Sequence, residues 1–281
     1  MVWRALFSSS FLFSLLSCAE PSTMARACET DAPVQVSEIY PTANSIPVNI
    51  IRFYIYFDAP MQTETVFPEI KLTDDGGNDI DGVFLENRYD LWSRDGRRLT
   101  LLLNPGRVKT GIKANEQFGS ALEKDRRYKL TVGAGALSAD GCAMTAPFSK
   151  PFVATTPDTV SPSPMRWEFQ TPVSGSRDQL QVQLDGIHDH VSLAYRVRVQ
   201  TLSGDQFAGR INVSAGETEW HFTPSTPWQD AEYSLVVDPL LEDVAGNRVN
   251  GLFDAPSGQS GYETTTTSAI VPFSTRMSQE R

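Results

Sequence analysis

The chain has 281 residues, of which 40% are hydrophobic and 10% aromatic, and its formal net charge is −10 at pH 7. This composition excludes a chain that is disordered throughout, and the length suits about two domains with packed cores. The negative charge argues against nucleic acid as a partner, because a protein that neutralises phosphates needs a basic face.

Residues 1–17 have the features of an export signal. A positive charge at Arg4 precedes an apolar run from Leu6 to Leu16, and Ser17 leads into Cys18. The run is too short to span a bilayer as a helix. The segment resembles the lipobox of bacterial lipoproteins, which implies a signal peptide over 1–17 and a diacylglycerol on the Cys18 thiol. Ordinary secretory cleavage and a buried helix are the alternatives.

Residues 18–33 are small and polar and are expected to form a tether. No later segment is apolar enough to cross a membrane, so attachment would depend on the lipid. Ala19 stands where an aspartate would, by resemblance to Gram-negative sorting rules, retain the protein in the inner membrane. The expected location is therefore the outer membrane of a bacterial cell envelope, and the side that the protein faces stays open.

Two cysteines, Cys28 and Cys142, remain if Cys18 is acylated. An oxidising exported compartment favours a disulfide between them, which would join the N-terminal arm to the end of the first domain. Two separate thiols are the alternative, because sequence alone fixes no distance.

Strand signals with a period of two recur along the rest of the chain. In residues 49–58, one face carries Ile51, Phe53, Ile55 and Phe57, and the other carries Ile50, Arg52, Tyr54 and Tyr56. Further alternating sets are Leu99, Leu101 and Leu103; Tyr128, Leu130 and Val132; Leu180, Val182 and Leu184; Tyr195, Val197 and Val199; Trp220 and Phe222; and Tyr233, Leu235 and Val237. No convincing amphipathic helix is present in the pattern.

The two halves of the chain repeat one another. The first contains IIRFYIYFDAPM, DGRRLTLLLNPG and DRRYKLTVGAGALSADGCAM, and the second contains DQLQVQLDGIHD, GETEWHFTPSTPW and AEYSLVVDPLLEDVAGNRV. The order and spacing of their turn signals match, as expected for tandem β-sandwiches. FDAPM, DGRRLTLLLNP and LEDVAGN resemble the bacterial Ig-like domain first associated with surface-layer proteins, the SbsA-like type.

This resemblance implies an all-β fold of two tandem Ig-like β-sandwich domains. The expected boundaries are 34–155 for domain 1 and 164–275 for domain 2, with a polar tail at 276–281. The proline-rich linker at 156–163 favours an extended, semi-rigid spacer, which would limit the angle between the domains without fixing it.

Acidic loops are the first candidate for a ligand site. Asp74, Asp75, Asn78, Asp79 and Asp81 are oxygen donors of the kind that bind calcium, but they lack the EF-hand spacing and its closing glutamate. A hairpin turn explains the same residues, since Asp, Asn and Gly accept left-handed backbone angles. Asp243 and Asn247 in LEDVAGN allow the same two interpretations, and a turn is favoured in both places.

The chain offers little for a metal or a catalytic centre. His188, Asp189 and His190, with His221, lack the further ligands and spacing of a zinc site, so a polar loop between strands is expected and no cofactor or metal is predicted. Nucleophile and phosphate-loop motifs are absent from the sequence. A carboxylate pair of a glycosidase is not excluded by spacing, but catalysis is not expected.

The segment from Asn104 to Arg127 is about a dozen residues longer than its counterpart in the second half. It clusters Arg107, Lys109 and Lys113 on an acidic chain, which makes it a candidate binding loop for an acidic glycan, a lipid headgroup or a protein. The alternative is a solvated excursion packed by apolar side chains of its own. Four tryptophans could stack on sugars or pack in cores: Trp92, Trp167, Trp220 and Trp228.

The sequence therefore favours a non-catalytic, lipid-anchored envelope protein that acts as a structural or binding module, of the scaffold or adhesion type. The first alternative is a carbohydrate-binding or accessory module of an envelope complex, and a carboxylate-based hydrolase is the least favoured. Expected partners are the membrane, through the lipid, and an envelope protein or glycan. The sequence does not predict the oligomeric state.

Overall fold

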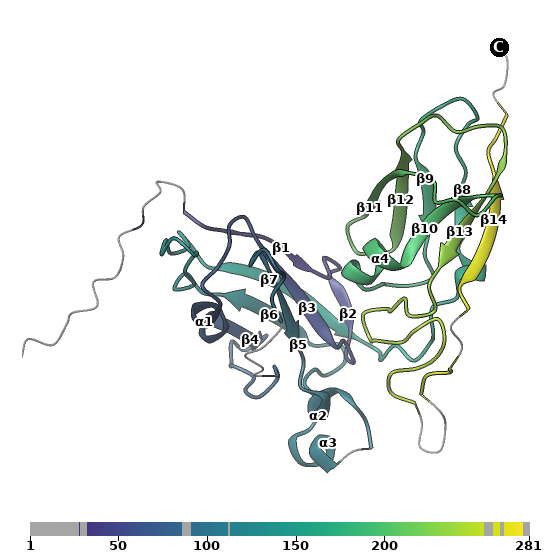
Figure 1. Cartoon of the computed structure of the whole chain (residues 1–281). Coiled ribbons are helices and arrows are strands. Elements are labelled where there is room, and N and C mark those ends of the chain that lie inside the picture. The colour runs from purple at the N-terminus through teal and green to yellow at the C-terminus, as the bar shows by residue number, and fades with distance from the viewer. Residues whose placement is uncertain are drawn as a thin grey trace, which may run out of the picture.

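The computed structural model describes residues 28, 33–85, 91–111, 113–255, 261–264 and 267–277. The expected signal peptide and Cys18 lie outside the described residues, as does most of the tether. The described chain forms two β-sandwiches that meet side by side (Figure 1), each built from one three-stranded and one four-stranded sheet.

Domain 1 packs an antiparallel sheet against a mixed one. The first sheet has the order β1 (Val36–Tyr40), β3 (Arg52–Phe57), β5 (Arg98–Leu102). The second has the order β2 (Ser45–Pro47), β7 (Phe148–Thr155), β6 (Arg127–Val132), β4 (Ile70–Asp74), and β2 runs parallel to β7. Short helices lie in the connections: α1 (Thr63–Val66), η1 (Phe67–Glu69), α2 (Pro105–Val108) and α3 (Lys113–Phe118).

Domain 2 has the two-sheet arrangement of an immunoglobulin constant-type sandwich. One sheet has the order β8 (Glu168–Gln170), β9 (Leu180–Gln183), β12 (Glu219–Pro224), β11 (Gly209–Val213). The other has the order β10 (Val197–Thr201), β13 (Glu232–Val237), β14 (Ala269–Ser274). The helices are η2 (Pro164–Arg166) and α4 (His190–Arg196). The predicted all-β fold of two sandwiches is confirmed.

Each sandwich has a core formed by the alternating residues that the sequence predicts. In β3, Phe53, Ile55 and Phe57 are buried in domain 1, and in β12, Trp220 and Phe222 are buried in domain 2. Each such side chain contributes about 1.5–3 kcal/mol through the area it removes from water. The alternation therefore fixes which face of each strand points inward.

The repeat is visible in a turn that follows the sixth strand of each sandwich. In domain 1 the Ser138 hydroxyl accepts a hydrogen bond from the Cys142 amide at 3.1 Å. In domain 2 the Asp243 carboxylate accepts one from the Asn247 amide at 2.9 Å. Gly141 and Gly246 have φ angles of 80° and 79°. Glycine adopts such positive φ angles without steric strain because it has no Cβ atom. Cys142 and Asn247 therefore occupy equivalent positions.

One predicted strand begins later than the sequence pattern indicates. Tyr195 lies in α4, where it is 77% exposed, and β10 begins at Val197. The helix forms because the Asp189 carboxylate caps it, accepting the Ser192 amide at 2.8 Å, and because Leu193 is buried. The predicted loop between strands holds for His188 and Asp189, whereas His190 is the first residue of this helix.

A disulfide joins Cys28 to Cys142, with the Cα atoms 4.6 Å apart and a separation of 114 positions in sequence. It attaches the arm that precedes β1 to the turn of domain 1 described above.

Replacing Cys28 and Cys142 together by Ser should lower the free energy of unfolding of domain 1 by about 3–5 kcal/mol, because the unfolded chain gains loop entropy. Urea denaturation of the oxidised protein and the variant measures the difference. Reductant should destabilise the parent protein and leave the variant unchanged. Complete alkylation of both thiols in unreduced native protein would show that the bond is absent.

Candidate functional site: the junction between the domains

The outward face of the β1–β3–β5 sheet is covered by domain 2. Figure 1 shows α4 and the long connection between β13 and β14 on the side of domain 2 that faces domain 1. Tyr54, which points away from the core of domain 1, is only 5% exposed because of this cover. Domain 2 therefore buries part of a sheet face that would otherwise lie in water.

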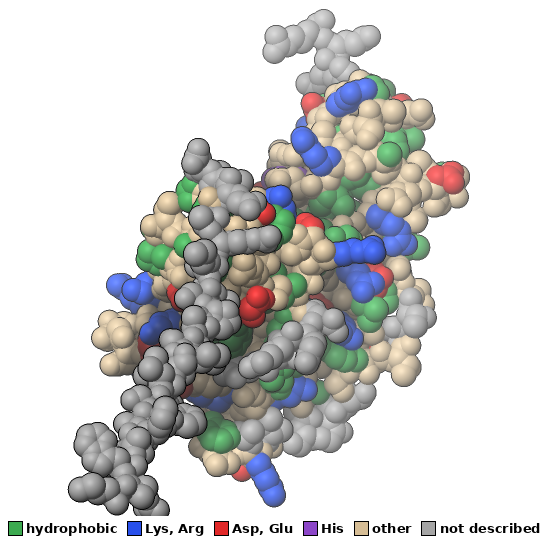
Figure 2. All heavy atoms as spheres, turned by 60° about the vertical axis from the view of Figure 1, so that its left-hand side comes forward, with side chains coloured by type: hydrophobic (Ala, Val, Ile, Leu, Met, Phe, Trp, Pro, Cys, Tyr) green, Lys and Arg blue, Asp and Glu red, His purple; other side chains and the backbone are tan. Residues whose placement is uncertain are grey.

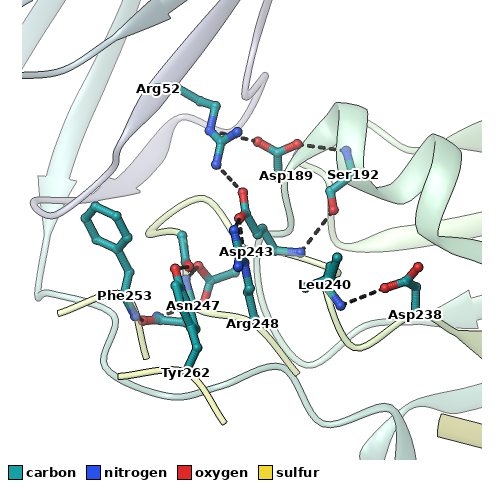
Figure 3. A network of polar contacts seen from close by, with 12 residues as sticks. Arg52, Asp189, Ser192, Asp238, Leu240, Asp243, Asn247, Arg248, Phe253 and Tyr262 are labelled. Carbon is teal, nitrogen blue, oxygen red and sulfur yellow. Dashed lines mark hydrogen bonds and ion pairs between the residues drawn. The ribbon is translucent and has the colours of Figure 1, made fainter. Parts of the chain in front are cut away.

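Buried ion pairs form the centre of the junction (Figure 3). Arg52 of β3 reaches two carboxylates of domain 2: its Nε lies 3.5 Å from Asp189 Oδ2, and its Nη2 bonds to Glu242. The Tyr54 hydroxyl donates to Asp189 at 2.9 Å. Arg248 donates from Nε to Glu242 Oε1 at 2.8 Å. Two guanidinium groups thus face two carboxylates, so the cluster has no net charge.

The burial of this cluster shifts its titrations. Burial pulls the pKa of Arg52 down, but the charges of Asp189 and Glu242 outweigh that effect and raise it. Burial raises the pKa of Tyr54, and the Asp189 charge raises it further. Burial also lowers the pKa of His190 to about 4, with a smaller contribution from Arg98. His190 is therefore neutral at pH 7 and stacks on the Tyr40 ring at a centroid distance of 3.6 Å.

Another buried carboxylate, outside the Arg52 cluster, joins the domains near the end of β1. Glu217, in the turn between β11 and β12, is fully buried and accepts the Thr42 amide at 2.8 Å and the Thr42 hydroxyl at 2.6 Å. Lys150 of domain 1 donates to the Ala43 carbonyl nearby, at 3.1 Å. Burial raises the pKa of Glu217, and the bonds from Thr42 oppose that rise. This contact holds a turn of domain 2 against the segment that leaves β1.

An apolar side chain of domain 2 completes the core of domain 1. Val244 is 4% exposed and belongs to the hydrophobic cluster of domain 1, while Ile187 packs against that cluster. The Ile51 amide donates to the Val244 carbonyl at 3.0 Å, which continues the backbone bonding across the junction. The two domains therefore share apolar contacts as well as ion pairs.

The candidate binding loop makes structural contacts instead of presenting all its charges to solvent. The Arg107 guanidinium donates to the carbonyls of Gly119 at 2.8 Å and Asp81 at 3.0 Å. Lys109 Nζ lies 4.2 Å from the centre of the Phe253 ring in domain 2, a cation–π contact. Of the three basic residues that the sequence singles out, Lys113 alone is exposed.

The tip of the same loop also bonds to domain 2. The Thr110 amide and hydroxyl donate to Asp254 Oδ2 at 3.0 and 2.8 Å. On the face shown in Figure 2, Lys and Arg side chains are scattered over both domains and do not gather into one basic patch. The structure thus places Arg107 and Lys109 in contacts within the chain, and ligand binding by this loop stays a prediction.

The other candidates are turns or packing residues. Asp74 accepts the Asn78 amide at 2.9 Å within a hairpin turn, as expected. Asp243 and Asn247 also form a turn. Trp167, Trp220 and Trp228 are buried in domain 2, and Trp92 stacks on Phe57 in domain 1. In the described part of the chain, His, Cys, Asp and Glu side chains form no group of three arranged to hold a metal ion, and no helix has the length and apolar character to cross a membrane.

Sequence reasoning missed the junction itself. The available signal was the pair Tyr54 and Tyr56 with Arg52 on the face of β3 that should meet solvent. Aromatic side chains on an outward face indicate that something covers them. Their partners, Asp189 and Glu242, are far away in sequence and carry no distinguishing pattern.

Comparisons with known proteins find only distant structural similarity. The chain matches no protein-family model and no curated protein sequence. A structure of Escherichia coli alpha-2-macroglobulin domains MG0-NIE-MG1 is 12% identical, covering 87% of this chain and 72% of that one, at a TM-score of 0.29. Surface-layer protein SbsC, domains 1–6, is 8% identical over 88% of this chain and 41% of that one, also at 0.29.

A chimeric titin Z1Z2 is 13% identical over 89% of this chain and 96% of that one, at 0.27. These TM-scores are below 0.5, so they carry no argument about family or activity. The assignment of two sandwiches rests on the strand order and register of this chain.

Replacing Arg52 by Ala should lower the free energy of unfolding by about 3–5 kcal/mol, because Asp189 and Glu242 would stay buried without their partner. Arg126→Ala is the matched control. Arg126 also contacts several carboxylates, but it is 40% exposed, and its loss should cost less than about 1 kcal/mol. Urea denaturation measures both. Equal costs for the two variants would contradict the central place of Arg52.

Val244→Ala should destabilise domain 1 by about 2 kcal/mol, although Val244 belongs to a turn of domain 2, because it leaves a cavity in the core of domain 1. Val213→Ala in β11, which is half-buried in domain 2, is the control and should leave domain 1 unaffected. Hydrogen exchange at the β6 amides follows domain 1 specifically. Unchanged protection there would show that Val244 is not part of that core.

Proposed function

We propose that this chain is a non-catalytic structural module of a bacterial envelope, in which two β-sandwiches act as one rigid body anchored through a lipid on Cys18. The observation that carries the proposal is the buried ion-pair cluster of Arg52 with Asp189 and Glu242 between the domains. A scaffold or spacer needs a fixed arrangement of its domains. This cluster makes a change in the orientation of the two domains energetically unfavourable.

The penalty comes from desolvation. Two domains on a flexible linker would leave their charges in water. Here Arg52 and Asp189 have lost much of their water, and that cost is offset only while both partners stay in place. Any rotation that separates them leaves a buried charge unpaired, so one orientation of the domains is favoured over its neighbours.

The path of the chain supports an arrangement in which the lipid anchor lies at the far side of domain 1 from domain 2. Val34, just before β1, pairs with Met144 beside the Cys28–Cys142 disulfide. Strand β1 then runs to Tyr40, which stacks on His190 at the junction. A lipid on Cys18 would therefore hold domain 1 near the membrane and place domain 2 farther from it.

A binding role is the second candidate, and exposed apolar side chains on domain 2 favour it. Tyr195, Leu202, Ile270 and Met165 are each at least 60% exposed. Stacking of a glycan on tryptophan is not supported, because Trp167, Trp220 and Trp228 are buried. A protein partner of domain 2 is thus the better form of this alternative.

Lipidation is tested by expressing the full chain and Cys18→Ser in a Gram-negative host with a radiolabelled fatty acid. The parent should incorporate label and fractionate with membranes, and the variant should do neither. Ser17→Ala, which keeps a small residue before the cysteine, is the control and should retain both. Label in the Cys18→Ser protein, or none in the parent, would remove the anchor from the proposal.

Rigidity is tested by small-angle X-ray scattering of the chain that begins at Ala19. One fixed arrangement should fit the parent data. Arg52→Ala should need an ensemble of arrangements, whereas Arg126→Ala should not. A parent curve that only a broad ensemble fits would contradict the rigid scaffold.

A further inference from the structure

The two sheets of domain 1 differ in what covers their outward faces. Domain 2 covers the outward face of the β1–β3–β5 sheet, so the outward face of the other sheet looks away from domain 2. Figure 1 shows β4 and β6 of that sheet on the side of domain 1 away from domain 2. The outward face of β4, β6 and β7 is called the outer sheet face below.

Strand alternation determines which side chains form the outer sheet face. Leu72 of β4 and Leu130 of β6 are buried in the core, so their neighbours in sequence point outward. The register places Lys129 between Thr73 of β4 and Pro151 of β7. The charged and hydroxyl-bearing outward residues are Lys71 and Thr73 on β4, Arg127, Lys129 and Thr131 on β6, and Ser149 on β7. In these three strands, which the structure describes in full, no Asp or Glu alternates to the outward side.

The two cations on the central strand of this face have no anionic partner. Arg127 and Lys129 are exposed, and neither forms an ion pair with a carboxylate of the described chain. Asp79 lies at the rim of the face and is paired with Lys71 at 2.9 Å. The outer sheet face therefore presents uncompensated positive charge on a chain whose formal net charge is −10.

The arm that leads to Cys18 is attached to the strands of this face. Cys28 is bonded to Cys142, which lies in the connection between β6 and β7. The ten residue steps from Cys28 back to Cys18 span at most about 35 Å when extended. Since a domain of this size has a radius of gyration of about 13 Å, a lipid on Cys18 keeps the outer sheet face within reach of the membrane surface.

We propose that the outer sheet face docks on the anionic headgroups of the membrane that holds the Cys18 lipid. This inference rests on the proposed lipid anchor and adds to it the side of the protein that meets the membrane. Arg127 and Lys129 lie against the phosphate groups in the docked state. The Thr131 and Ser149 hydroxyls are 2.9 Å apart, so one hydrogen joins them and the other is free to donate to a phosphate oxygen.

Charge selects the orientation, whereas the lipid supplies the attachment. Each Lys or Arg next to an anionic membrane favours contact by about fivefold, so Arg127 and Lys129 together favour the docked orientation by about 30-fold. The surrounding acidic surface of the chain is repelled by the same headgroups. The membrane is also the nearest anionic surface, because the tether holds domain 1 beside it.

The test attaches the lipid chemically to the full mature chain that begins at Cys18. Because Cys28 and Cys142 are joined, Cys18 carries the free thiol, which is coupled to a maleimide lipid in vesicles. The vesicles consist of POPC alone or of an equal mixture of POPC and POPG. Brief acetylation followed by mass spectrometry then reports how accessible each lysine is. The coupling needs no host enzyme, so the result does not depend on whether cells lipidate the chain.

Lys129 should be acetylated at least tenfold more slowly on the POPG-containing vesicles than on POPC, because docking covers it. Lys113, which is exposed in α3 outside the outer sheet face, should react at the same rate on both. High salt should restore the reactivity of Lys129, because it screens the attraction to the headgroups.

Two matched variants test the role of charge. Arg127→Gln removes one cation of the face and should reduce the protection of Lys129 about fivefold. Arg210→Gln, which neutralises an exposed arginine of β11 in domain 2, is the control and should leave the protection unchanged.

Lys129 that reacts at the same rate on both kinds of vesicle would overturn the docking and leave the lipid anchor untouched. If Lys129 is slow on both, neutral headgroups or a second copy of the chain cover the face, and the anionic partner is wrong. Full protection in Arg127→Gln would also overturn the proposal, as would protection that is lost in Arg210→Gln.

Discussion

The structure depends on the burial of the Arg52 guanidinium at the junction. Arg52 lies on the outward face of β3, where it loses water and must bond to Asp189 and Glu242. Asp189 in turn caps α4 through the Ser192 amide. The Ser192 hydroxyl accepts the Glu242 amide at 3.0 Å, which ties the helix to the turn. One charge of domain 1 therefore organises a helix and a turn of domain 2.

The fold could be predicted from sequence because its causes are local. Alternation in β3, β9 and β12 sets the inward face, and glycines such as Gly246 set the turns. The junction between the domains could not be predicted in this way. Alternation shows which face of the strand a residue occupies, but it does not show what covers that face. Tyr54 has the pattern of a solvated outward residue, yet a second domain buries it. The helix at His190–Arg196 could not be predicted either, because its N-cap, Asp189, lies in a polar segment that is equally compatible with a loop.

The contacts of the long loop of domain 1 could not be predicted from the sequence either. A loop of that length in a compact domain needs a partner, and the sequence gives no reason to seek that partner inside the chain. Lys109 and Thr110 contact Phe253 and Asp254, which belong to the connection between β13 and β14. That connection is itself longer in domain 2 than its counterpart in domain 1. The two enlarged segments are thus explained by each other, because each supplies the surface on which the other is ordered.

The turn that is repeated in the two domains has the same structural role in each. In domain 1, the turn places Cys142 so that it bonds to Cys28, in the arm that enters the domain. In domain 2, the same position is Asn247, which donates to the carbonyl of Asp158 in the linker that enters that domain. Each sandwich therefore uses one position to hold the segment that precedes it. In domain 1 this position holds the arm by a covalent bond, whereas in domain 2 a hydrogen bond suffices, because Arg52 and Val244 already bring the two domains together.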